Sequence, residues 1–306
     1  MSARARSLAT GLRRLALVLV LVAMLVGFGN REAPAAQRVP ELDVLVAVDR
    51  TTSMSALDDP SGSRITAVRR DLTELGDQLD TVRFALISFG AKAEVELPFT
   101  SDRVAFADEV RSLQVEPADT GVGTSVGRPV RLIESELDRA AAADPTRIPV
   151  LVLVSDGENT APTEQESFAG IADRVRAAVV LGYGSAEGGV MPLDRVAVDQ
   201  QPPAAAQAAP LVTVRETGRP ALSRLDEDNL RAIADQIGAA FVHRDGTQDV
   251  AAVGDALERA AYAELEPGRP ERELRWLWAV LLLALVLPEL RTGWRGFLAA
   301  RREARA

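Results

Sequence analysis

Three short segments of the chain combine carboxylate and hydroxyl side chains in a pattern that suits a hard metal cation. The segments are 49–55, 121–125 and 155–158. The side chains that supply the oxygens are Asp49, Thr51, Ser53, Thr124 and Asp156. Oxygen donors without histidine or cysteine favour Mg²⁺, Mn²⁺ or Ca²⁺. Because these side chains do not fill an octahedral shell, we expect the cation to keep one position open for a ligand from outside.

The three segments can meet only if the elements around them belong to one sheet. Val- and Leu-rich runs predict strands at 44–48, 84–89, 93–99, 150–154, 177–181 and 240–242. Apolar residues at helical spacing predict helices at 65–79, 104–113, 130–137, 168–175, 226–237 and 248–263. The alternation predicts an α/β fold with a doubly wound, mostly parallel, Rossmann-like sheet covered on both faces. Ligands bind outside the carboxyl ends of parallel strands, so all three segments are expected on that edge.

Two features depart from the regular alternation. Strand 93–99 follows a turn at Gly90 and is expected to pair antiparallel with 84–89. Residues 184–222 hold glycine and proline clusters, an alanine-rich stretch and a predicted hairpin around Gly218. We interpret them as an insertion before the helix that follows.

Each polar segment taken alone has a simpler explanation. Aspartate, serine and threonine after a strand often cap the next helix. Capping would suffice to explain Asp156, and for Thr124 alone it is as good an explanation as metal binding. Only the three segments in order favour a metal site.

In this order the segments resemble a known protein-binding site. Asp49-x-Thr51-x-Ser53, then Thr124, then Asp156-Gly157 resemble the metal-ion-dependent adhesion site (MIDAS) of von Willebrand factor A (VWA) domains. The resemblance covers roughly residues 41–264 and implies a role for each residue. The three hydroxyls would offer oxygens to the metal, and the two aspartates would hold it directly or through water.

Two further stretches resemble the Bat (aerotolerance-type) group of membrane-anchored bacterial VWA proteins. They are Ser223-Arg224-Leu225-Asp226 with the helix that follows, and Arg272-Glu273-Leu274-Arg275-Trp276, which leads into the last apolar run. The resemblance implies a non-enzymatic, membrane-tethered protein-binding module of a cell-envelope complex, whose protein partner supplies an acidic side chain to the cation. It also implies other VWA proteins or a MoxR-type ATPase system as associates.

The composition excludes several other chemistries. The 306 residues contain no cysteine and one histidine, His243, which excludes thiolate sites and a zinc site with several imidazoles. The chain has 35 basic and 44 acidic residues, and the tails outside 33–288 hold ten arginines and three glutamates. The body therefore has 25 basic and 41 acidic residues, a net charge of −16. This charge argues against nucleic acid as a partner.

Two apolar runs flank the acidic body. The run 15–28 follows arginines, and the run 276–287 has tryptophans near both ends and arginines beyond it, which favours membrane segments. The expected divisions are a signal anchor or signal peptide at 1–32, a VWA domain at 40–264, a transmembrane helix at 274–290 and a basic cytoplasmic tail at 291–306. We expect the domain to face outside the cell membrane, with both termini cytoplasmic if the first helix is retained.

A serine hydrolase is the alternative from another class. Residues 123–127 match G-x-S-x-G, the nucleophile elbow of α/β-hydrolases, and Ser125, Asp156 and His243 follow in the chain order of those triads. The elbow needs an apolar strand that ends at its first glycine, whereas residues 116–120 are polar.

Overall fold

A computed structural model describes most of the acidic body and a few residues outside it. The described residues are 41–79, 82–118, 123–193, 209–246 and 249–263, with residue 20 and scattered positions between 283 and 302. The chain divides into two compact units, one over 40–264 and one made of 1–39 and 265–306. The expected segments 1–32, 274–290 and 291–306 lie outside the described residues apart from those single positions. Among the residues described, no helix is long and apolar enough to span a membrane.

The larger unit is built on a six-stranded sheet, in the order β3-β2-β1-β4-β5-β8. The strands are β1 (Leu42–Asp49), β2 (Val82–Phe89), β3 (Ala93–Thr100), β4 (Ile148–Ser155), β5 (Ala177–Tyr183) and β8 (Ala240–Arg244). All neighbours are parallel except β3, which pairs antiparallel with β2 as expected. The predicted α/β fold with a mostly parallel sheet is therefore confirmed.

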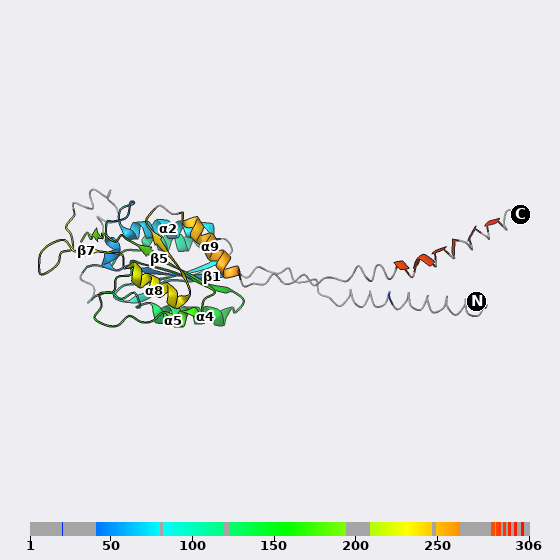
Figure 1. The fold of residues 1–306 in the computed structure, drawn as a ribbon, viewed down its shortest axis with the longest axis horizontal. Coiled ribbons are helices and arrows are strands. Elements are labelled where there is room, and N and C mark those ends of the chain that lie inside the picture. The colour runs from blue at the N-terminus through cyan, green and yellow to red at the C-terminus, as the bar shows by residue number, and fades with distance from the viewer. Residues whose placement is uncertain are drawn as a thin grey trace. The chain divides into compact units, whose positions relative to one another are not determined.

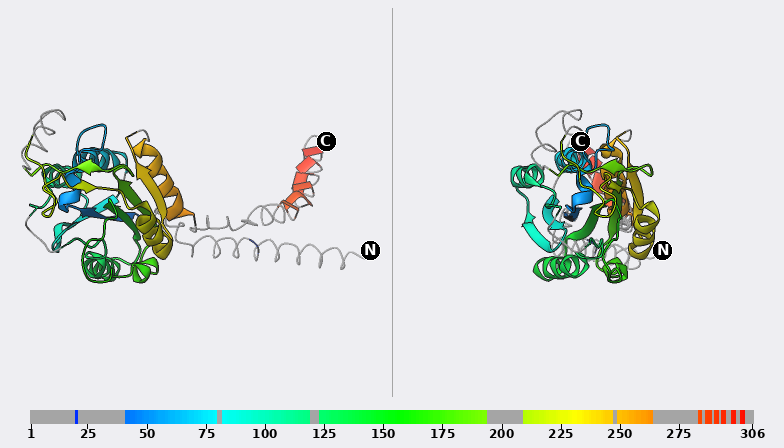
Figure 2. Two further views of the ribbon diagram at one scale, coloured as in Figure 1. Left: turned by 60° about the vertical axis from the view of Figure 1, so that its left-hand side comes forward. Right: turned by 90° about the vertical axis from the view of Figure 1, so that its left-hand side faces the viewer.

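Helices cover both faces of the sheet, with α2 and α9 on one side and α4, α5 and α8 on the other (Figures 1 and 2). The first layer is α2 (Arg64–Gln78), α3 (Arg103–Ser112) and α9 (Val250–Tyr262), and the second is α4 (Val130–Ala143), α5 (Ala169–Ala172) and α8 (Glu227–Ile237). The central strands are apolar on both sides because each side faces a helical layer. In β1, Val44, Val46 and Val48 enter one core cluster, whereas Leu45 and Ala47 enter the other.

Two predicted helices have different bounds in the structure. The helix expected at 168–175 is only the short α5. The chain joins the sheet soon after it, because the Arg176 amide already donates to the carbonyl of Pro149 in β4. Helix α4 runs six residues beyond its expected end, through the alanines up to Ala143. Alanine has the highest helix propensity, which favours this extension.

The insertion forms a small second sheet beside the main one. Strands β6 (Gly189–Val190) and β7 (Leu222–Ser223) pair antiparallel, and residues 194–208 between them are not described. The predicted hairpin is present: the Gly218 amide donates to the Val214 carbonyl, and Gly218 has a φ of +65°. Glycine suits this turn because it adopts positive φ at no steric cost.

Candidate functional site

The first carboxylate of the site, Asp49, is the last residue of β1 and is buried. Its Oδ1 accepts a hydrogen bond from the Thr51 amide at 2.9 Å. Its Oδ2 accepts one from the Ser155 hydroxyl at 2.7 Å. Parallel pairing sets Val48 beside Val154, so β1 and β4 end at the same level and their loops leave the sheet together. The first and third polar segments therefore meet at the carboxyl edge of the sheet.

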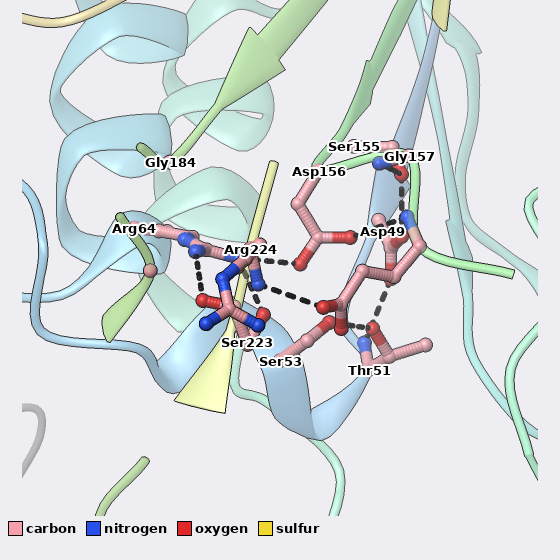
Figure 3. Close-up of polar contacts among 12 residues, drawn as sticks. Asp49, Thr51, Ser53, Arg64, Ser155, Asp156, Gly157, Gly184, Ser223 and Arg224 are labelled. Atoms are coloured by element: carbon pink, nitrogen blue, oxygen red, sulfur yellow. Dashed lines mark hydrogen bonds and ion pairs between the residues drawn. The ribbon is translucent and has the colours of Figure 1, made fainter. Parts of the chain in front are cut away.

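Two hydroxyls stand next to Asp49 on a tight turn. After Thr51 the chain enters the 3₁₀ helix η1 (Thr52–Ser55), which brings Thr51 Oγ1 to 2.8 Å from Ser53 Oγ. Both residues are buried, and Figure 3 shows their hydroxyls beside Asp49. One hydroxyl must donate to the other, so the pair still has oxygen lone pairs available for a cation.

The second carboxylate, Asp156, follows β4 and has less than 1% of its surface exposed. Its Oδ2 accepts a hydrogen bond from Arg64 Nη1 at 2.8 Å, and its Oδ1 accepts one from the Glu158 amide at 3.1 Å. Gly157 next to it has a φ of +80°, and a Cβ there would lie 2.4 Å from the Asp226 carbonyl oxygen. Only glycine fits this turn, which keeps Asp156 at the sheet edge.

Thr124 reaches the same place from the loop before α4. Its amide donates to Thr160 Oγ1 at 2.9 Å, and its carbonyl accepts from the Thr160 and Ala161 amides. Thr124, Thr51 and Ser53 line one cavity of about 250 Å³, together with Glu158 and Thr160. The structure thus brings the three predicted hydroxyls to one cavity. Asp49 and Asp156 do not line it, but each accepts a hydrogen bond from the backbone amide of a residue that does, Thr51 and Glu158 respectively.

The electrostatics of the cluster fit a bound cation. Burial, and then the negative charge of Asp156, raise the pKa of Asp49 to about 7. A metal ion held by residues of this cluster would relieve this repulsion, which hydroxyl hydrogen bonds only partly offset. Arg50 does not neutralise the site, because its guanidinium pairs with Glu96 of β3 at 3.3 Å. The donor set is all oxygen and suits a hard divalent ion.

Helix capping does not explain these residues. Helix α4 begins at Val130, and its N-cap is Pro129, so Thr124 caps no helix. The side chain of Thr51, the N-cap of η1, makes no capping bond. The Asp156 side chain accepts its amide bond from Glu158 in a loop, more than ten residues before α5.

The hydrolase alternative is not assembled in the structure. His243 Nε2 lies 2.8 Å from the Gly184 carbonyl oxygen, and the Asp156 carboxylate is bonded to Arg64. Among the described residues, no hydrogen bond joins Ser125, Asp156 and His243. Residues 116–118, which precede the proposed elbow, form no strand. A triad requires base and nucleophile within hydrogen-bond reach, and this arrangement does not provide that.

Four residues of the site were not anticipated from the sequence: Arg64, Ser155, Glu158 and Thr160. Burial and then the charge of Asp156 raise the pKa of the Glu158 carboxyl. Arg64 carried a usable signal, since it lies one helical turn before Val68 on the apolar face of α2. A charged residue in phase with an apolar face must find a buried partner.

The mostly parallel sheet and the polar cluster at its carboxyl edge resemble those of VWA domains, and comparison with known proteins agrees with this resemblance. Residues 44–158 match the von Willebrand factor type A domain family. A protein of Mycolicibacterium paratuberculosis described as a UPF0353 protein is 26% identical over 250 residues, which cover 81% of this chain and 68% of that protein.

Two solved structures share the fold. BatB from Bacteroides thetaiotaomicron, a conserved hypothetical protein, has a TM-score of 0.56 at 23% identity, covering 72% of this chain and 98% of that one. An aerotolerance-related membrane protein from Bacteroides fragilis has a TM-score of 0.55 at 21% identity, covering 72% and 99%. The segment 44–158 thus matches the VWA domain family, and the chain shares its fold with these two bacterial proteins.

Proposed function

We propose that the chain is a metal-dependent protein-binding module that holds a divalent cation, Mg²⁺ or Mn²⁺, at the carboxyl edge of its sheet. Asp49, Thr51, Ser53, Thr124 and Asp156 would hold the ion. An ion held by hydroxyls and few carboxylates stays electrophilic, so an acidic side chain of a partner protein would complete its shell.

One observation carries this proposal. The Thr51 and Ser53 hydroxyls lie 2.8 Å apart and share a cavity with Thr124, which comes from a loop about seventy residues further along the chain. Asp49, whose carboxylate accepts a hydrogen bond from the Thr51 amide next to this cavity, has its pKa raised by burial and by the charge of Asp156. A buried carboxylate without a cationic partner is unfavourable, and a divalent cation would supply the counter-charge that, among the described residues, Arg64 gives to Asp156 but not to Asp49.

Membrane tethering is part of the same proposal. The apolar run 276–287 and the tryptophans around it support an anchor. Among the described positions near that run, Leu283, Leu287 and Trp294 are 58%, 54% and 66% exposed. The aerotolerance-related protein from Bacteroides fragilis is described as a membrane protein. A reporter fused after residue 306 should be active only in the cytoplasm, and an exported reporter would contradict the proposed topology.

Titration of the full-length chain with Mn²⁺ tests the cation site. We expect saturable binding of one ion, which Mg²⁺ displaces, and at least a hundredfold loss of affinity in Asp49→Asn. Ser55→Ala is the matched control, because Ser55 lies on the same turn but donates to the Thr52 carbonyl at 2.7 Å. Absence of saturable Mn²⁺ binding in the parent chain would overturn the proposal.

The partner's contribution is tested separately by crosslinking in cells. Specific crosslinked proteins should be lost in Asp49→Asn and after chelation, but kept in Ser55→Ala. Crosslinks that persist in Asp49→Asn would show that the partner binds elsewhere.

A further inference from the structure

Arg64 is the first residue of α2 and the largest fully buried side chain among the described residues. Its guanidinium has five N–H donors, and all are satisfied. Nε and Nη2 bind the two oxygens of Asp58 at 2.8 and 2.6 Å. Nη1 binds Asp156 Oδ2 at 2.8 Å and Ser223 Oγ at 2.7 Å. Nη2 also binds the Ser223 carbonyl at 3.0 Å.

The guanidinium is locked in place on its flat face as well. A Cβ on Gly184 would lie 2.6 Å from Arg64 Cζ, so the arginine lies against the backbone after β5. Figure 3 shows it between Gly184, Ser223 and Asp156. Four separate stretches of chain therefore hold one cationic group beside a carboxylate of the proposed site. Moving this side chain away from Asp156 would require breaking several charge-assisted hydrogen bonds.

The two carboxylates share the arginine unequally. Asp58 takes two parallel hydrogen bonds in the fork geometry that is strongest for arginine, whereas Asp156 takes one. Asp58 also accepts hydrogen bonds from the amide and hydroxyl of Ser185, which fix its orientation. Asp58 thus neutralises most of the guanidinium charge and leaves Asp156 able to attract a second cation.

We propose that the Asp58–Arg64 pair sets the affinity of the metal site, because Asp58 controls how strongly the Arg64 guanidinium competes with the metal ion for Asp156. This inference rests on the proposed function. Arg64 is a positioning residue that acts through Asp156, and Asp58 weakens its competition with the metal. Loss of Arg64 should tighten metal binding, and loss of Asp58 should weaken it. Both effects follow because charges that lie close together in a buried site attract each other strongly.

The test is Mn²⁺ titration of the full-length chain and its variants. In Asp58→Asn the guanidinium faces Asp156 without its main partner, so we expect about tenfold weaker Mn²⁺ binding. In the double variant Asp58→Asn/Arg64→Met the competing cation is gone, so binding should be at least tenfold tighter than in Asp58→Asn. The double variant has the same net charge as the parent, which removes long-range charge as an explanation.

A matched control lies at the other end of β1. There Asp43 Oδ2 and Arg83 Nη2 form an ion pair at 2.5 Å, six residues along the strand from Asp49. Asp43→Asn/Arg83→Met makes the same chemical change and should leave Mn²⁺ affinity within twofold of the parent.

The outcomes separate this inference from the function on which it rests. If the two residues only supported the fold, the double variant would bind no better than Asp58→Asn, and that result would overturn the inference. Should the double variant not fold, as judged by circular dichroism, Asp58→Asn alone decides, and a change of less than twofold overturns it. A parent chain that does not bind Mn²⁺ would instead overturn the proposed function.

Discussion

The hydroxyl of Ser155 donates a hydrogen bond to Asp49 Oδ2 at 2.7 Å, joining the last residues of two adjacent parallel strands. Ser155 also accepts a hydrogen bond from the Gly157 amide at 2.9 Å. One small side chain therefore holds the carboxylate of β1 and the loop that carries Asp156. The site's two carboxylates are positioned by this bridge rather than by contact with each other.

Removing the bridge should destabilise the protein. Ser155→Ala deprives a buried carboxyl of its donor and the Gly157 amide of its acceptor, so we expect a loss of about 2 kcal/mol in the free energy of unfolding. Urea unfolding measures it. Ser55→Ala, which removes one buried hydroxyl bond on the neighbouring turn, should cost about 1 kcal/mol or less. Equal losses in the two variants would show that the bridge has no special role.

The turn after β4 should not tolerate a side chain. Gly157 and Gly238 have similar φ values, +80° and +75°, but a Cβ at Gly157 would meet the Asp226 carbonyl at 2.4 Å, whereas Gly238 has no atom within 4 Å. We expect Gly238→Ala to cost about 1 kcal/mol from backbone strain alone, and Gly157→Ala about 3 kcal/mol or more because backbone must also move. Thermal and urea unfolding would compare them. Similar costs would contradict the steric argument.

Acid should weaken the contribution of Asp58. Burial by itself would raise the pKa of this carboxyl, but the hydrogen bonds and charge of Arg64 outweigh it and lower the pKa below the ordinary 3.8. A lowered pKa stabilises the fold above the ordinary value, and this stabilisation is lost as pH falls through the folded-state value.

Asp58→Asn should therefore be less stable than the parent by about 2 kcal/mol at pH 7, and the difference should shrink once the pH falls below 3.8. Urea unfolding at several pH values between 7 and 3 measures it. A difference that stays constant over this range would mean that the Asp58 charge does not contribute.

Metal should stabilise the chain through mass action. At a Mg²⁺ concentration one hundred times the Kd, binding to the native state adds about 2.7 kcal/mol. For a unit of this size that corresponds to a rise in Tm of about 5–10 °C. Differential scanning fluorimetry with and without chelator measures it. Asp49→Asn should show no rise, and an equal rise in that variant would place the stabilising ion elsewhere.

The amino-acid sequence by itself determined the mostly parallel sheet and its helical layers, and it predicts the five oxygen-bearing residues of the proposed site. Unbroken apolar runs such as 150–154 can be satisfied only in a strand covered on both faces, and the helical spacing of 65–79 supplies one of the covers. Both signals can be recognised within a short segment, because the side chains of a helix or a strand face the core at a regular spacing along consecutive residues.

Only the tertiary structure decided which side chains support the site. Ser155 and Asp49 are 106 residues apart in the chain, and Arg64 and Asp156 are 92 apart. Such pairs depend on strand order, register and the depth of a buried arginine. No local pattern encodes these properties, because the free energy that selects them comes from burying polar groups together in one three-dimensional place.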